Sequence, residues 1–292
     1  MPPFRRQPSW KRRVADAARQ APRRGRELRE AAAQLDIPWA RWKIVGLGRE
    51  NFMRFILNPV MDVYASRRAT GREKLSALKG PVILVANHAS HMDTPVILSA
   101  LPRRLRKKTV VAAAADYFYR RRSVAWLVSF IFNTTPIDRD GGGLSKNGSH
   151  LDHLLDEGWN LLLYPEGTRS RNGTQGRIRR GAAVLAAAHD LKIVPIRVTG
   201  TREAMPPGRL WPKRLQTKTN AFSRRHRITV SFGEPIAPMG DTAQLIERVQ
   251  AFFDNASGGS ISPYRSPYTK LGAKHGSGGA GTNGHGTGNG AN

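Results

Sequence analysis

The sequence predicts an α/β fold in which a mostly parallel sheet is flanked by helices. Short apolar runs and helical patterns alternate through the middle of the chain, as they do where crossover helices join parallel strands. Two of these runs break off into clusters of polar and charged residues, at strand ends where α/β proteins place their chemistry. An amphipathic helical segment precedes this region, and the composition of both chain ends predicts disorder.

Composition divides the chain of 292 residues into four parts. Residues 1–36 form a basic, largely disordered arm, which fits either a solvated tail or a lipid-binding segment. Residues 37–70 form the amphipathic helical segment, residues 71–256 hold the α/β domain, and residues 257–292 form a Gly-rich disordered tail.

The amphipathic segment carries apolar and aromatic residues at helical spacing, with cations between them. This pattern suits a helix that lies in a membrane interface, and it also suits a helix that packs on its own domain. Pro59 is expected to kink or end the helix. The apolar positions are Trp39, Trp42, Phe52, Phe55, Ile56, Val60 and Val63, and the interleaved cations are Arg41, Lys43, Arg49 and Arg54.

Periodicity places the elements of the α/β domain. The longest apolar segment, residues 124–132, is too short to span a bilayer and is predicted to be a core helix. Neither a transmembrane helix nor a secretory signal is expected. Strands are expected at residues 82–86, 109–113, 160–164, 193–198 and 227–232, and helices at 94–101, 117–131, 145–157, 180–189 and 241–254.

Charge and cysteine usage limit the function. The chain has 48 Lys plus Arg against 21 Asp plus Glu, a formal net charge of +27, so its partners should be anionic. An enzyme of phosphorylated lipids at a membrane surface fits this, and so does a non-enzymatic protein that binds acidic lipid or nucleic acid. The aromatic stacking pattern of RNA-binding modules is missing, which argues against nucleic acid. The absence of cysteine excludes disulfides, thiolate metal ligands and a Cys nucleophile within the chain.

The first polar cluster follows the predicted strand 82–86 and contains His88, Ser90 and Asp93. Five helical steps of ~100° would place the side chains of His88 and Asp93 ~140° apart, so both cannot lie on one regular helix and hydrogen-bond. If His88 lies in a turn and Ser90 caps a helix that begins near Asp93, the turn can fold His88 back onto the carboxylate. That contact would fix the tautomer and leave one imidazole nitrogen as a base. The alternative is an ordinary polar strand-to-helix turn.

Three more blocks follow in order, and together they carry a resemblance. They are Ile137-Asp-Arg139, Pro165-Glu-Gly-Thr-Arg169 at the end of a second apolar run, and Val194-Pro-Ile196. The order N-H-x4-D, I-D-R, P-E-G-T-R, V-P-I resembles that of the glycerolipid acyltransferases, typified by the lysophosphatidate (1-acylglycerol-3-phosphate) acyltransferases. The resemblance covers about residues 71–238 and leaves both chain ends uncovered.

The resemblance implies transfer of a fatty acyl group from a thioester, acyl-CoA or acyl-carrier protein, to the free hydroxyl of a lysophospholipid. The expected acceptor is 1-acylglycerol-3-phosphate, giving phosphatidate; glycerol-3-phosphate or another lysolipid would use the same base. His88 matches the family's catalytic base and Asp93 its orienting carboxylate. No metal or cofactor is expected, because the thioester is already activated. The enzyme would act peripherally, on an anionic membrane surface at the cytoplasmic face.

Further residues match the family's acceptor site. Glu166, Gly167, Thr168 and Arg169 match the block that holds the acceptor. Arg169 offers a planar fork for phosphate, and Glu166 would orient it or accept a hydrogen bond from a glycerol hydroxyl. Arg139 is a candidate for the acceptor phosphate or for an ion pair with its neighbour Asp138.

The predicted helix at 180–189 adds a further phosphate candidate. Arg180 lies beside the start of this helix, where anions bind readily. The chain departs from the family at Asn133, where Gly is usual, and at Tyr164, where Phe is usual. Asn tolerates positive φ, so the turn at position 133 can persist. His91 is expected to be a supporting or surface residue.

Overall fold

The structure is a computed structural model that describes residues 35–114, 122–137, 150–167, 169, 176, 178–209, 211–215, 225–238 and 241–255. The Gly-rich tail and nearly all of the basic arm lie outside the described residues, as do Arg139 and Thr168.

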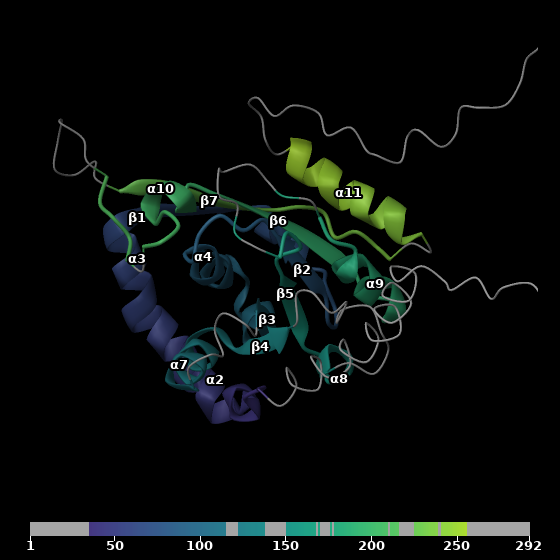
Figure 1. Ribbon diagram of the computed structural model, residues 1–292, viewed down its shortest axis with the longest axis horizontal. Coiled ribbons are helices and arrows are strands. Elements are labelled where there is room, and N and C mark those ends of the chain that lie inside the picture. The colour runs from purple at the N-terminus through teal and green to yellow at the C-terminus, as the bar shows by residue number, and fades with distance from the viewer. Residues whose placement is uncertain are drawn as a thin grey trace, which may run out of the picture. The chain divides into compact units, whose positions relative to one another are not determined.

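The described residues form one seven-stranded sheet with the strand order β1-β7-β6-β2-β5-β3-β4 (Figure 1). All neighbouring strands pair in parallel except β6 and β7, so the predicted mostly parallel sheet is confirmed. The strands are β1 (Ala65–Thr70), β2 (Ile83–Ala86), β3 (Thr109–Ala114), β4 (Thr134–Ile137), β5 (Asn160–Leu163), β6 (Ile193–Thr199) and β7 (His226–Phe232).

Helices cover both faces of this sheet, and side chains alternate between two apolar cores. Along the central strand β2, Ile83 and Val85 pack with residues of α8, α9 and α11. Leu84 and Ala86 face the other core, with residues of α4 and of the N-terminal helices. This two-residue period is that of a strand buried on both faces. The α-helices of the described residues are α2 (Lys43–Phe52), α3 (Asn58–Tyr64), α4 (Asp93–Ala100), α5 (Arg103–Lys107), α7 (Arg122–Phe132), α8 (His150–Asp156), α9 (Gly181–Ala188), α10 (Thr201–Ala204) and α11 (Thr242–Asn255).

The strands β1 and β4 are not among those predicted from the sequence. Strand β1 also corrects the boundary of the amphipathic helical segment, because residues 65–70 belong to the sheet and pair with β7. Its sequence, ASRRAT, has no apolar run, since it is an edge strand with alternate side chains exposed. The β4 sequence, TTPI, has only four residues and also lacks an apolar run, although its two threonines are buried.

The N-terminal helices pack on the α/β domain. The helix does not end at Pro59: a π-helical turn, Met53–Leu57, precedes it and the chain continues as α3 to Tyr64. Such a turn accommodates the hydrogen bond that proline cannot donate. Arg49, one of the cations interleaved in the amphipathic segment, is buried and donates to the carbonyls of Phe130 and Ala40 at 2.6 Å each. Burial lowers the pKa of Arg49 to about 10, so it keeps its charge at neutral pH.

Candidate active site

The turn after β2 folds back on itself. His88 lies in this turn and Asp93 is the first residue of α4, as the spacing predicts. Asp93 Oδ2 accepts hydrogen bonds from the backbone N–H groups of Ala89 and Ser90, at 2.7 and 2.8 Å, and lies 2.8 Å from His88 Nδ1. One carboxylate oxygen therefore closes the turn and holds the imidazole.

Ser90 supports the turn without capping the helix. The N-cap of α4 is Met92, which makes no side-chain cap, so the expectation that Ser90 caps this helix is wrong. The Asp93 carboxylate already satisfies the free N–H groups of the turn. The Ser90 hydroxyl instead donates to the Met205 carbonyl at 2.7 Å and accepts from the Met92 N–H at 3.1 Å.

Asp93 is completely buried, and its remaining oxygen is also satisfied. Oδ1 accepts a hydrogen bond from the hydroxyl of Thr201, the first residue of α10, at 2.6 Å. A carboxylate held by this many donors acts as a fixed acceptor. His88 Nδ1 donates its hydrogen to Asp93, and Nε2 keeps a lone pair that can take a proton. Thr201 lies 108 residues away, and no local pattern in the sequence points to it.

Glu166 joins the two principal motifs. Its Oε1 accepts from the backbone N–H of His88 at 3.1 Å, and its Oε2 accepts from the N–H of Gly176 at 2.8 Å. Burial raises the pKa of Glu166 above its ordinary value, and these hydrogen bonds oppose that rise. The side chain therefore fixes the His88 turn against the loop after β5. Its role in substrate binding stays a prediction.

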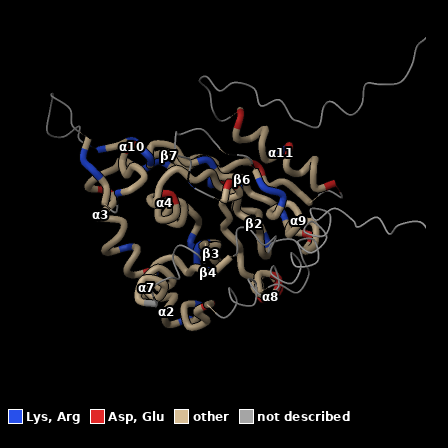
Figure 2. The backbone as a smooth tube through the Cα atoms, in the orientation of Figure 1, with Lys and Arg blue, Asp and Glu red and all other residues tan. Residues whose placement is uncertain are grey.

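The loop after β5 brings arginines toward the same end of the sheet. Gly167 has a φ of +72°, which favours glycine, and a Cβ there would lie 2.9 Å from Arg179 Cζ and would displace this guanidinium. Arg180 is exposed at the N-cap of α9. Other basic residues lie on β1 and β7 (Figure 2). Thr168 and Arg139 lie outside the described residues, so their predicted roles stay predictions.

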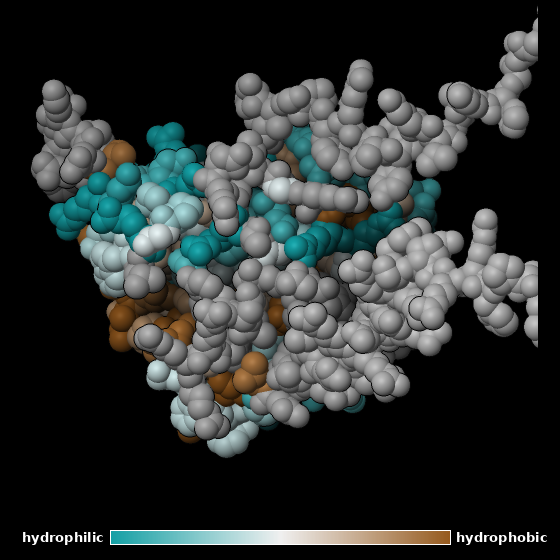
Figure 3. All heavy atoms as spheres, viewed as in Figure 1, coloured by the Kyte–Doolittle hydropathy of each residue, from teal (hydrophilic) through white to brown (hydrophobic). Residues whose placement is uncertain are grey.

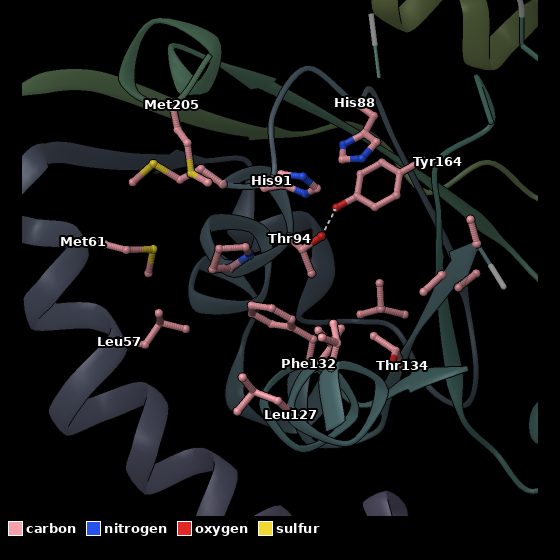
Figure 4. A pocket seen from close by; sticks show the side chains of 18 of the residues that line it. Leu57, Met61, His88, His91, Thr94, Leu127, Phe132, Thr134, Tyr164 and Met205 are labelled. Atoms are coloured by element: carbon pink, nitrogen blue, oxygen red, sulfur yellow. Dashed lines mark hydrogen bonds between the residues drawn. The ribbon is translucent and has the colours of Figure 1, made fainter. Parts of the chain in front are cut away.

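An apolar cavity of about 620 Å³ opens beside His88 (Figure 4). Its wall combines side chains from the N-terminal helices, from β3 and from α7 with His88, His91, Thr94 and Tyr164. The apolar residues around it include Leu57, Val60, Met61, Val111, Val124, Leu127, Val128, Phe132 and Met205. The imidazole of His88 thus stands at one end of a space that suits an alkyl chain.

His91 is more than a surface residue, because it lines this cavity close to His88. Burial, and then the charges of Arg169 and His88, together lower the pKa of His91 to about 4. His91 is therefore uncharged at neutral pH, and Arg169 lies near enough to influence it. Within the described part of the chain, no group of His, Cys, Asp and Glu residues could hold a metal ion.

Asn133 behaves as the sequence predicts. It adopts a φ of 54° in the turn between α7 and β4, so an asparagine serves at the position where the family usually has glycine. Its side-chain amide also donates to the Thr109 carbonyl at 2.9 Å, which binds the turn to β3.

Comparisons with known proteins identify a family that this chain resembles. A family model described as Acyltransferase matches residues 66–199. A chloroplastic 1-acyl-sn-glycerol-3-phosphate acyltransferase from Arabidopsis thaliana is 30% identical over 139 residues, which are 47% of this chain and 37% of that protein. The alpha form of the human 1-acyl-sn-glycerol-3-phosphate acyltransferase is 31% identical over 121 residues, 40% of each chain. The chain thus spans less than half the length of these relatives.

A solved structure is also similar. It is that of the 1-acyl-sn-glycerophosphate acyltransferase PlsC from Thermotoga maritima, with 19% identity and a TM-score of 0.49, covering 71% of this chain and 81% of that one. The similarity to this family rests on the family model, whose residues 66–199 include the N-H-x4-D and P-E-G-T-R blocks, and on the curated relatives. Residues 66–199 of this chain therefore match the acyltransferase family.

Proposed function

We propose that this protein transfers a fatty acyl group from a thioester, acyl-CoA or acyl-carrier protein, to the free hydroxyl of 1-acylglycerol-3-phosphate, giving phosphatidate. The observation that carries the proposal is the pairing of His88 Nδ1 with buried Asp93 at 2.8 Å, at the end of an apolar cavity. The curated relatives named for this acceptor support its choice.

His88 acts as the general base. Its Nε2 takes the proton of the acceptor hydroxyl while the oxygen attacks the thioester carbonyl, and Asp93 stabilises the imidazolium that forms. The proton then passes to the departing thiolate sulfur, which leaves as the free thiol. Proton transfer by a positioned base contributes ~10²–10⁴ to the rate.

The cavity beside His88 holds the alkyl chain of the acyl group. Burial of each CH₂ group in such a space contributes ~0.8 kcal/mol, so a fatty acyl chain supplies much of the binding free energy. Arg169 and Arg180 hold the acceptor phosphate, with Gly167, Thr168 and Arg139 as the further residues that the motifs assign to acceptor binding.

An apolar surface around the mouth of the cavity docks the protein peripherally on an anionic membrane. The prediction that residues 124–132 form a core helix is wrong, because in α7 the side chains of Trp126 and Leu127 are 57% and 58% exposed. They lie beside exposed residues of the N-terminal helices, where Figure 3 shows apolar surface next to α3 and over α2 and α7. None of the helices in the described residues is long and apolar enough to cross a bilayer. The exposed residues of this docking surface are Trp42, Ile44, Leu47, Phe55, Ile56, Val63, Val124, Trp126, Leu127 and Trp211.

The continuity of this docking surface with the cavity supports the proposal. Val124, Leu127 and Trp211 are exposed and also line the cavity, so a lipid chain can pass from a bilayer toward His88 without crossing a polar barrier. Trp211 additionally donates from its indole N–H to the Tyr64 hydroxyl at 2.8 Å, which holds it beside α3.

The test is transfer from acyl-CoA and from acyl-carrier protein to a panel of acceptors, with the products identified by mass spectrometry. The panel contains 1-acylglycerol-3-phosphate, glycerol-3-phosphate and zwitterionic lysolipids, and His88→Ala is the matched inactive control. We expect phosphatidate from 1-acylglycerol-3-phosphate, with a His88→Ala rate lower by ~10²–10⁴. Thioester hydrolysis that is unchanged by every acceptor would contradict the proposal.

A further inference from the structure

Two hydroxyl groups face each other in the wall of the apolar cavity. Tyr164 follows β5 and Thr94 follows Asp93 in the first turn of α4, and their hydroxyl oxygens lie 2.7 Å apart (Figure 4). The contact links the loop of one motif to the helix of the other. Burial, and then the negative charge of Asp93, raise the pKa of Tyr164 far above its ordinary value, so the phenol keeps its proton and can donate.

The ring of Tyr164 covers one face of the catalytic imidazole. The ring centroids of Tyr164 and His88 lie 4.1 Å apart with an angle of 23° between the planes, which is a stacked arrangement. The bond to Asp93 fixes only one edge of the imidazole, at Nδ1. The imidazole ring can still rotate about that single hydrogen bond, and this rotation would move Nε2 out of line with the acceptor hydroxyl. A ring packed on its face prevents this motion.

The hydroxyl bond in turn fixes the plane of the tyrosine ring. Asp93 and Thr94 are adjacent in α4, so one dipeptide holds the edge of the imidazole through a carboxylate and its face through the phenol. A phenylalanine at position 164 would fill the same space but would lack the bond that sets its orientation.

We infer that Tyr164 and Thr94 are positioning residues that together hold the His88 imidazole in the plane required for proton transfer. This inference deepens the proposed function and rests on His88 being the base. The hydroxyl groups of Tyr164 and Thr94 act through His88, so losing them should slow the chemical step and leave the binding of both substrates unchanged.

The kinetic test compares Tyr164→Phe, Thr94→Val and the double variant in the full-length chain, with acyl-CoA and 1-acylglycerol-3-phosphate. Each single variant should lower kcat ~10-fold with both KM values unchanged, and the double variant should be no slower, because either change removes the same bond. Thr94→Ser keeps the hydroxyl and should therefore keep the wild-type kcat. Thr70→Val is the matched control, since it removes a similar bond, Thr70 to Ser231 at 3.0 Å, on the exposed sheet edge.

A second measurement does not depend on turnover and so separates this inference from the proposed function. In protein labelled with ¹⁵N-histidine, the Nδ1–H signal of His88, assigned by its loss in His88→Ala, should be sharp in the wild type and in Thr94→Ser. It should broaden in Tyr164→Phe and Thr94→Val as the ring pivots. An unchanged signal together with kcat within twofold of the wild type in both single variants would overturn the inference. Losses that simply add in the double variant would also overturn it, because they would reflect separate packing defects.

Discussion

An Asp93→Asn variant should keep the hydrogen-bonded geometry of the His88 turn and lose only its negative charge. The backbone N–H groups of Ala89 and Ser90 both donate to Oδ2, and an N–H cannot accept a hydrogen bond. The asparagine must therefore turn its oxygen toward them. Its NH₂ group then faces the hydroxyl of Thr201, which can accept. His88 Nδ1–H keeps an oxygen acceptor, so the productive tautomer is retained.

The lost charge matters when His88 takes the proton of the acceptor and becomes an imidazolium. His88 Nδ1 lies 2.8 Å from Asp93 Oδ2, so the centres of the two charged groups are a few ångströms apart. Opposite unit charges about 4 Å apart attract by ~4 kcal/mol at an effective dielectric constant of about 20. Since each ~1.4 kcal/mol is a tenfold change in rate, kcat should fall ~10³-fold while both KM values stay unchanged.

The assay is steady-state transfer from acyl-CoA to 1-acylglycerol-3-phosphate, with thermal melting as the folding measurement. Asp152→Asn is the matched control, because Asp152 lies 2.7 Å from His189 Nε2 in a similar carboxylate–imidazole pair that does not line the cavity. It should lower the melting temperature and leave kcat unchanged. A folded Asp93→Asn protein that kept more than about a tenth of the wild-type kcat would refute the reasoning, because His88 would then need no counter-charge.

Three further changes test other parts of the structure. Arg169→Ala removes a charge-assisted contact worth ~1.5–3 kcal/mol, so it should raise the KM for the acceptor and leave the KM for acyl-CoA unchanged. A raised KM for acyl-CoA with an unchanged KM for the acceptor would assign Arg169 to the donor. The Phe55→Ser/Trp126→Ser double variant changes exposed side chains, and co-sedimentation with anionic vesicles should fall while melting stays constant; undiminished binding would place the membrane surface elsewhere. Although burial acts to raise it, hydrogen bonds from His150 and Arg41 lower the pKa of Asp36 from 3.8 to about 2. Ionised Asp36 therefore stabilises the fold above pH 3.8, and this contribution is lost as the pH falls from 3.8 toward 2. The melting temperature of Asp36→Asn should therefore depend less on pH in that range than the melting temperature of the wild type.

Local sequence determined the central part of this protein. Strands β2, β3, β5 and β6 are buried on both faces, so each appears as an apolar run that periodicity can find. Because parallel strands end at the same edge, the polar residues that follow β2 and β5 had to lie together. The five-residue spacing of His88 and Asp93 required a turn that folds back, and the structure has one.

Tertiary structure alone decided the features that depend on distant partners. Edge strand β1 carries polar residues because alternate side chains are exposed, so its sequence lacks the apolar signal. Edge strand β4 lacks this signal for another reason, because its two threonines are buried and hydrogen-bond to Ser129 and Asp36. Arg49 has the charge of a solvent-facing residue, yet it is buried because the carbonyls of another helix are within its reach.

The same holds within the candidate active site. Thr201 reaches Asp93 across 108 residues, and Tyr164 reaches Thr94 across 70. Periodicity records only whether a position faces the core, whereas these contacts depend on which elements the whole sheet brings together. The contact of His88 with Asp93 could thus be predicted from the spacing of two residues, and the side chains that hold them in place could not.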